Sequence, residues 1–378
     1  MSRPQAPVQI PSLDGIRAGS FILVFLAHAG LENVVPGGVG VTTFFFLSGF
    51  LITTLMRQEL AETGEVSFKH FYLRRVLRIM PPFYAVLLLA ALLSSLGAIA
   101  GPPQYKPLLA QALHFANYWA VRHGSQGQIA GTGVYWSLAV EEHFYLLFPA
   151  IFVLLHRALR RPLHRAAFLW GICLLILAWR CALVFGAGVV PDRTYLASDT
   201  RIDSILFGCV LALVKNPALD REGPGERMRW LRVMLPAGGG LMLLSLLFRD
   251  PRFRETFRYS VQGVALYPFF VCAVRNPGLS VFRLLNHRLV QRIGVLSYSL
   301  YLVHHVVILG VRRAFQIHPV LQAVIAFAIS FLVASAIWRW IERPCARLRQ
   351  RLTHHAPATP DRLPARVASA ARADPPVP

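Results

Sequence analysis

The apolar residues of this chain are gathered into blocks of about 20 residues, and this feature limits its fold more than any other. A helix needs about that length to cross the hydrocarbon core of a bilayer. Hydrophobic residues make up 55% of the chain and charged residues only 15%, whereas about 25% of a soluble protein is charged. A single soluble core is therefore excluded, and we expect an all-α, polytopic membrane helical bundle.

Ten segments have the composition of membrane-crossing helices. They are residues 16–34, 38–57, 80–100, 135–155, 166–187, 202–215, 232–248, 258–275, 292–311 and 319–341. Residues 106–122 form a shorter amphipathic segment, which we expect to lie at the membrane interface rather than to cross the bilayer.

The basic residues predict how these helices are oriented. With the N-terminus inside, 28 of the 39 Lys and Arg residues fall in inner segments and ten in outer segments. Cytoplasmic loops of membrane proteins carry such an excess. The bias accounts for the net charge of +21 without a nucleic-acid partner, and it predicts that both termini are cytoplasmic.

The composition divides the chain into two regions. Residues 1–343 would form the membrane-embedded domain, whereas residues 344–378 are rich in Pro, Ala and Arg. Because such a segment has no apolar face to bury, we expect a disordered cytoplasmic tail.

Several ionisable residues lie within the predicted spans. In the orientation above, His28, Glu141, Glu142, Asp203 and His304 all fall in the outer half of the membrane. Ionisable residues at membrane depth usually face the bundle interior or a water-filled cavity and mark functional sites. Their common depth therefore predicts a site that faces outward.

Each of these residues also has a purely structural explanation. A lone histidine often makes a hydrogen bond between helices, and Asp203 is near enough in sequence to pair with Arg201. Adjacent helical residues point about 100° apart, so we expect only one of Glu141 and Glu142 to face a shared cavity. Because all of these residues lie at a similar depth, we favour the functional explanation for the group as a whole.

Arginines gather at the predicted inner end of the third span, in "RRVLRIMPPFY". Arg75 and Arg78 are three residues apart and would share one helix face, and Pro81 with Pro82 would fix the start of the helix. One explanation is an anchor that contacts lipid phosphates. The other is a phosphate-binding site, since guanidinium groups suit phosphate, and Arg17 is a further candidate for it.

Motifs for other enzyme classes are missing from the sequence. It has no H-E-x-x-H, no P-loop and no G-x-S-x-G, so a metal enzyme, an ATPase and an α/β-hydrolase receive no support. We expect neither a metal site nor a bound cofactor. Ser48, which interrupts an apolar span, and Tyr301, in "SYSLYLVHH", are secondary candidates beside Asp203 and His304.

Seven segments in order resemble one known family. They are "LDGIRAGSFILVFLAHAG", "FFFLSGFLIT", "RRVLRIMPPFY", "WSLAVEEHFYLLFP", "RIDSILFG", "SYSLYLVHH" and "WIERP". Over about residues 11–344, the chain resembles the acyltransferase type 3 family of bacterial integral-membrane O-acyltransferases. We expect this chain to lack the soluble SGNH-type domain that some members append.

The resemblance implies a multi-pass acyltransferase (EC 2.3.1.-) of the bacterial inner membrane. Such enzymes move an acyl group, mostly acetyl from acetyl-CoA, to a hydroxyl of a surface or exported glycan. Some use lipid-linked or small-molecule acceptors instead. By the matched motifs, Arg17 and His28 correspond to the essential pair of the first motif, and Arg75 and Arg78 correspond to the R-x-x-R motif on the CoA side. The glutamate pair of the family corresponds to Glu141 and Glu142.

A mechanism follows as an expectation. Acyl-CoA would be held by the arginines at the cytoplasmic mouth, with its thin arm reaching through one continuous passage to His28. His28 would act as general base, oriented by Glu142 or Glu141; a transient acyl-histidine is the rival. A multi-pass transporter is the non-enzymatic alternative, but the sequence has no inverted repeat.

Overall fold

The computed structural model describes residues 10, 12–101 and 103–353, and no β-strand occurs among them. Nine helical segments of this part of the chain are long and apolar enough to cross a membrane. They are built on α1 (Leu13–Leu26), α2 (Gly37–Thr63), α3 (Phe68–Ser95), α6 (Trp136–Ala158), α7 (Pro162–Cys181), α12 (Leu235–Leu247), α14 (Phe257–Arg275), α16 (Arg288–Ala314) and α17 (Pro319–Ile337). The prediction of a polytopic all-α bundle is confirmed.

The sixth predicted span, residues 202–215, forms a helix that is shorter than the others. It is α10 (Asp203–Val214), and its residues from Asp203 to Leu213 are all buried. A helix that is apolar all round belongs inside a protein. It packs against α2, α7 and α14, so neighbouring helices shield it.

The remaining helices are short connectors. They are α4 (Tyr105–Ala112), α5 (Ala116–His123), α8 (Pro191–Leu196), α9 (Ser198–Arg201), α11 (Glu226–Arg229), α13 (Pro251–Glu255) and α15 (Ser280–Arg283). The amphipathic segment 106–122 is thus two helices of eight residues each, which are too short to cross a membrane.

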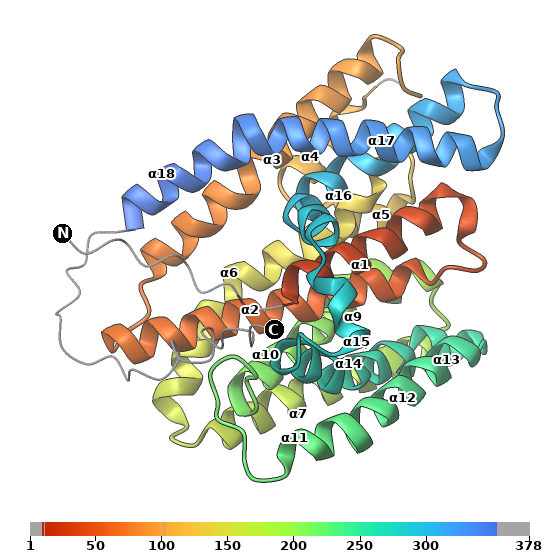
Figure 1. Cartoon of the computed structure of the whole chain (residues 1–378). Coiled ribbons are helices and arrows are strands. Elements are labelled where there is room, and N and C mark those ends of the chain that lie inside the picture. Colours follow the sequence, from red (N-terminus) through yellow and green to blue (C-terminus); the bar gives the residue numbers. More distant parts are fainter. Residues whose placement is uncertain (1–9, 11, 102, 354–378) are drawn as a thin grey trace, which may run out of the picture.

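The centre of the bundle is formed by two tight crossings. Helix α2 packs against α10, and α1 packs against α16 and α2 (Figure 1). A Cβ on Gly208 would lie only 1.9 Å from the carbonyl oxygen of Phe46, and one on Gly49 1.9 Å from that of Ile205. Only glycine permits backbones to approach so closely, which is a common device between membrane helices.

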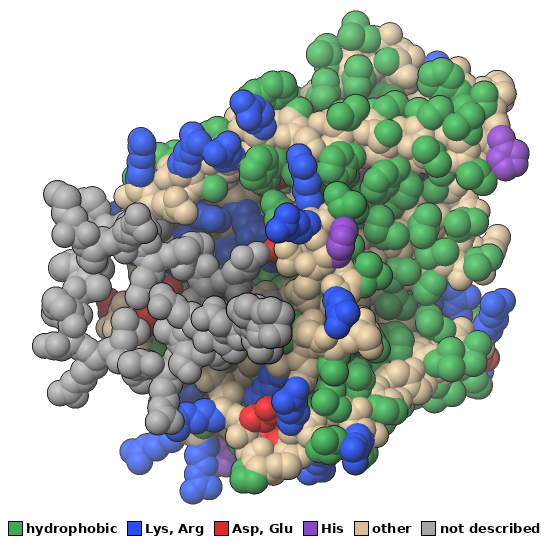
Figure 2. Space-filling view, in the orientation of Figure 1, with side chains coloured by type: hydrophobic (Ala, Val, Ile, Leu, Met, Phe, Trp, Pro, Cys, Tyr) green, Lys and Arg blue, Asp and Glu red, His purple; other side chains and the backbone are tan. Residues whose placement is uncertain are grey.

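The surface divides by chemistry. In Figure 2, Lys and Arg side chains gather at the left, over α18 (Arg343–Thr353) and the start of α3, while hydrophobic side chains cover much of the middle and right. Leucines such as Leu88 and Leu332 are 67% and 68% exposed. An apolar exterior of this kind is stable in lipid, which is the environment that the sequence predicts.

The predicted disorder of the C-terminal region is wrong for its first ten residues. The chain continues from α17 through a π-helical turn (Trp338–Glu342) into α18, which packs along α3 (Figure 1). Contacts with α3 stabilise α18, and the composition of the segment does not reveal these contacts. Residues 354–378 of the predicted tail lie outside the described residues.

Candidate active site

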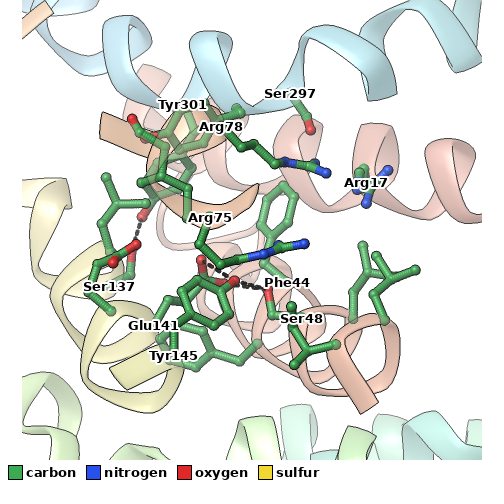
Figure 3. A pocket seen from close by; sticks show the side chains of 18 of the residues that line it. Arg17, Phe44, Ser48, Arg75, Arg78, Ser137, Glu141, Tyr145, Ser297 and Tyr301 are labelled. Carbon is green, nitrogen blue, oxygen red and sulfur yellow. Dashed lines mark hydrogen bonds between the residues drawn. The ribbon is translucent and has the colours of Figure 1, made fainter. Parts of the chain in front are cut away.

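A cavity of about 180 Å³ lies between α1, α2, α3, α6 and α16 (Figure 3). Its polar lining includes most of the residues that the sequence singled out, together with apolar side chains of α2. The predicted residues that line it are Arg17, Ser48, Arg75, Arg78, Glu141, Glu142 and Tyr301. Residues from five helices, up to 284 positions apart in the chain, thus share one space.

The start of α3 carries two of the arginines. Helix α3 begins at Phe68, where the hydroxyl of Ser67 accepts a hydrogen bond from the backbone of the first turn, and it runs through Pro81 and Pro82. The prediction that these prolines mark the start of the helix is wrong, because membrane helices tolerate prolines when neighbours support them. Arg75 and Arg78 therefore sit on an ordered helix and point into the cavity from one face (Figure 3).

The cavity contains a concentrated positive charge. Arg17 forms an ion pair of 2.6 Å with Asp14. The guanidinium of Arg75 lies 5.7 Å from the ring centroid of Tyr145, and its Nε atom is buried without a hydrogen-bond partner among the described residues. A buried donor without a partner is costly, so this geometry favours an anionic or hydrogen-bond-accepting ligand in the cavity.

The two glutamates face the same cavity. The hydroxyl of Ser48 donates a hydrogen bond of 2.7 Å to Glu141, and the hydroxyl of Tyr145 lies 3.4 Å from the same carboxylate. Glu142 also lines the cavity but makes no side-chain hydrogen bond within the described part of the chain. The expectation that only one of the pair faces the cavity is therefore wrong, because the cavity extends far enough around α6 to include both.

His28 belongs to a separate cluster of three histidines. Its Nδ1 atom lies 2.9 Å from Nε2 of His304, and its ring stacks on that of His305 with the centroids 4.4 Å apart. His304 is fully buried, and its Nδ1 lies 2.8 Å from the backbone oxygen of Tyr301. The structure thus brings His28 and His304, which lie in different predicted spans, into direct contact.

A local distortion of the first span presents His28. The chain leaves α1 through a π-helical turn (Ala27–Leu31) that ends beside Gly30, whose φ of 110° requires glycine. Arg312 donates a hydrogen bond of 3.1 Å to the backbone oxygen of His28. Turns of this kind are frequent at functional sites, and here one holds a histidine ring against α16.

The histidine cluster and the cavity are adjacent but distinct. Tyr301 lines the cavity, and its ring centroid lies 5.5 Å from that of His304 and 6.0 Å from that of Phe44, another lining residue. Neither His28 nor His304 lines the cavity. The cavity does not reach His28, so the expected continuous passage from the arginines to His28 is not seen in this structure; the ring of Tyr301 is the side chain that both lines the cavity and contacts His304.

Asp203 lies apart from both groups. Its carboxylate forms an ion pair of 2.8 Å with Arg180, and both side chains are fully buried. Arg201, the partner that sequence distance suggested, instead lies over the ring of Tyr259 at 3.8 Å. The structural explanation of Asp203 as an ion-pair partner therefore holds, but with Arg180 in place of Arg201, because helices α7 and α10 pack side by side and bring Arg180 to the carboxylate.

Three residues of the site region were missed by the sequence analysis. Tyr145 follows Glu141 by one helical turn, and this spacing of four residues was a usable signal. Arg180 was visible as an arginine well inside a predicted span, seven residues from its nearer end. Arg312 had no signal, because its role depends on the π-helical turn that exposes the carbonyl of His28.

Comparisons with known proteins identify relatives of this chain. The O-acetyltransferase OatA of Staphylococcus aureus strain NCTC 8325 is 29% identical over 360 residues, which are 91% of this chain and 58% of OatA. A second protein, from strain COL and provisionally named an O-acetyltransferase, is 27% identical over 347 residues, or 89% of this chain and 57% of its own. The chain therefore spans less than three-fifths of the length of these curated relatives. No solved structure matches it.

The family comparison covers nearly the whole described region. The model of the acyltransferase domain of type 3 matches residues 10–339, which include every helix that lines the cavity and all three clustered histidines. The chain therefore belongs to the type 3 acyltransferase family.

Proposed function

We propose that this protein is a multi-pass O-acyltransferase of the bacterial inner membrane. It would move an acetyl group from acetyl-CoA to a hydroxyl of a sugar in a cell-surface or exported glycan. Family membership and the names of the relatives support O-acetyl transfer. The single observation that carries the donor assignment is the cavity in which three arginines meet two glutamates.

The arginines suit the phosphates of the donor. Arg17, Arg75 and Arg78 converge on one cavity, and the buried Nε of Arg75 needs an acceptor. Guanidinium groups bind phosphate through paired hydrogen bonds. Glu142, which makes no side-chain hydrogen bond within the described residues, would accept hydrogen bonds from the amide groups of the pantetheine arm.

His28 would be the general base. The acceptor hydroxyl would give its proton to the imidazole while its oxygen attacks the thioester carbonyl, and the carbon–sulfur bond would break to release CoA thiolate. That thiolate would then take the proton from the imidazolium. The expected orienting role of a glutamate is not adopted here, because the ring of His28 contacts His304 and His305 and Glu141 contacts Ser48.

The separation of the cavity from His28 implies a movement in the reaction cycle. Tyr301 lines the cavity and its ring contacts His304, and its hydroxyl lies 2.7 Å from that of Ser137. The pantetheine arm would displace the Tyr301 ring to bring the thioester to His28. Such a gate would also keep the thioester from water until an acceptor is bound.

Reconstituted full-length protein supplies the first test. Vesicles containing the chain would receive acetyl-CoA labelled in the acetyl group on the arginine side and a glycan preparation on the other. Label in ester linkage to the glycan supports the proposal, and label that enters the vesicle unchanged would instead support a transporter. A mass difference on the surface polysaccharide after gene deletion would identify the acceptor class.

A matched pair of variants tests the donor site. Loss of one charge-assisted hydrogen bond costs about 1.5–3 kcal/mol, so Arg78→Gln should raise the KM for acetyl-CoA by about 10- to 100-fold. Arg74→Gln is the control, since Arg74 lies on the same helix, pairs with Glu59 at 2.7 Å and does not line the cavity. Equal effects of the two changes would remove the phosphate assignment.

A further inference from the structure

Two hydrogen bonds in series connect the ring of His28 to the backbone of α16. Nδ1 of His28 lies 2.9 Å from Nε2 of His304, and Nδ1 of His304 lies 2.8 Å from the backbone oxygen of Tyr301. His304 is 0% exposed, so both of its ring nitrogens are shielded from water. The three groups form a short chain that ends on a fixed carbonyl.

The direction of both bonds follows from the chemistry of the carbonyl. A carbonyl oxygen only accepts, so Nδ1 of His304 must carry the proton of that bond. In a neutral imidazole the other nitrogen is then an acceptor, and Nε2 of His304 must accept from Nδ1 of His28. The proton of a neutral His28 is therefore on Nδ1, and its Nε2 keeps the lone pair.

Nε2 of His28 is also the nitrogen that remains accessible. It makes no hydrogen bond to another described residue, and it is not one of the buried polar atoms that lack a partner. The groups around the ring reinforce this arrangement without competing for Nε2. His305 stacks on the ring face at 4.4 Å, and Arg312 binds the backbone oxygen of His28.

We propose that His304 is a positioning residue, which fixes the tautomer and orientation of His28 so that Nε2 is the base. The inference rests on the proposed role of His28 and adds the residue that makes that role possible. In serine hydrolases a buried carboxylate holds the catalytic imidazole in the same way. Here a neutral imidazole bound to a carbonyl does so, which avoids burying a charge in the membrane.

The arrangement also accounts for the proton during transfer. When the acceptor hydroxyl gives its proton to Nε2, His28 becomes an imidazolium, and its Nδ1–H becomes a stronger donor to His304. His304 stabilises this charge through its Nε2 lone pair, and its full burial disfavours transfer of the proton to it, because an imidazolium is costly at a site without water. The proton remains on His28 until the CoA thiolate takes it.

Two substitutions at residue 304 separate positioning from packing. His304→Leu keeps the volume but removes the acceptor, so kcat should fall by about 100-fold or more, as when general-base catalysis is lost. The KM for acetyl-CoA should stay within a factor of two, because residue 304 does not line the donor cavity. His304→Gln restores an acceptor and a donor, and it should recover most of kcat.

The control is Phe25→Leu, which alters a ring that packs against His304 at 6.4 Å between centroids but changes no hydrogen-bonding side chain. This change should leave kcat within a factor of three. Wild-type kcat in His304→Leu, or a Gln variant as inactive as the Leu variant, would overturn the inference.

A spectroscopic measurement does not depend on turnover. In the full-length protein with ¹⁵N-labelled histidine, His28 should carry its proton on Nδ1, and this preference should disappear in His304→Leu. A proton on Nε2 of wild-type His28 would overturn the inference even if the enzyme is active. Wild-type protein with the Nδ1 proton but without acetyl transfer would instead refute the proposed function and leave the tautomer assignment intact.

Discussion

The buried ion pair between Arg180 and Asp203 allows a quantitative test of the fold. Both side chains are 0% exposed, and the nitrogen–oxygen distance is 2.8 Å. Arg180 also donates to the backbone oxygens of Thr256 (3.0 Å) and Thr200 (2.6 Å). The pair therefore links α7 and α10 to the start of α14, and we predict that it is structural rather than catalytic.

The expected magnitudes follow from this geometry. Removing one partner of a buried ion pair costs about 3–5 kcal/mol, because the other charge stays buried without compensation. Asp203→Leu should therefore lower the folding equilibrium constant by about two to three and a half orders of magnitude. In the double variant Arg180→Met/Asp203→Leu both charges are gone, and the remaining cost comes from two carbonyls that lose a donor, at about 1–3 kcal/mol each. We expect the double variant to be less destabilised than the sum of the single variants by about 2 kcal/mol or more.

The assay is equilibrium unfolding of purified protein in mixed micelles, followed by tryptophan fluorescence, with acetyl transfer measured per folded molecule. Asp203→Leu should keep its turnover per folded molecule, because Asp203 lines no part of the cavity. If the costs of the two single variants add up to the cost of the double variant within about 0.5 kcal/mol, the coupling between Arg180 and Asp203 is refuted. Loss of turnover in a fully folded Asp203→Leu protein would return Asp203 to the catalytic candidates.

Three further changes test other parts of the structure. Gly208→Ala should cost about 1–3 kcal/mol of stability, because its Cβ would lie 1.9 Å from the oxygen of Phe46, whereas Gly19→Ala, with no atom within 4 Å, should stabilise the protein by up to about 1 kcal/mol in the same unfolding assay. Burial, with a smaller effect of a neighbouring histidine, lowers the pKa of His114 to about 4, below its ordinary value of about 6.5. Between these pH values the unfolded chain binds more protons than the folded chain, so the free energy of unfolding should fall as pH drops from about 6.5 to 4. The variant His114→Asn should flatten this dependence on pH, and asparagine tolerates the φ of 58° at this position. Tyr145→Phe removes a hydroxyl that lies 3.2 Å from Ser48, and it should reduce turnover without changing the unfolding free energy by more than about 1.5 kcal/mol; an unchanged turnover would exclude this hydroxyl from the site.

The fold was largely predictable because a bilayer permits few solutions. Once blocks of sufficient length were found, helices were the expected structure for each, and only their ends were uncertain. The start of α3 shows the limit: its first turns are polar, so a hydropathy pattern places the helix at about residue 80, whereas the cap at Ser67 places it at Phe68. Helix α18 was missed for the same reason, since contacts with α3 and not its own composition keep it ordered.

The site was predictable in its parts but not in its arrangement. Charge and depth selected Arg75, Arg78 and Glu141, which do meet in one cavity. Depth alone could not separate His28 from that cavity, because two residues at the same depth can face different neighbours. The π-helical turn after Leu26 contains His28 and helps to set where its ring points, and a hydropathy pattern does not reveal such a turn.

The shortness of α10 has a consequence for biogenesis. Its 12 residues rise only about 18 Å, against about 30 Å of hydrocarbon, so the translocon would not release this segment into lipid on its own account. Helices α2 and α7 are synthesised earlier and form two of the walls around it, whereas α14 emerges later and forms the third. We therefore predict that α10 enters the membrane together with the helices that surround it.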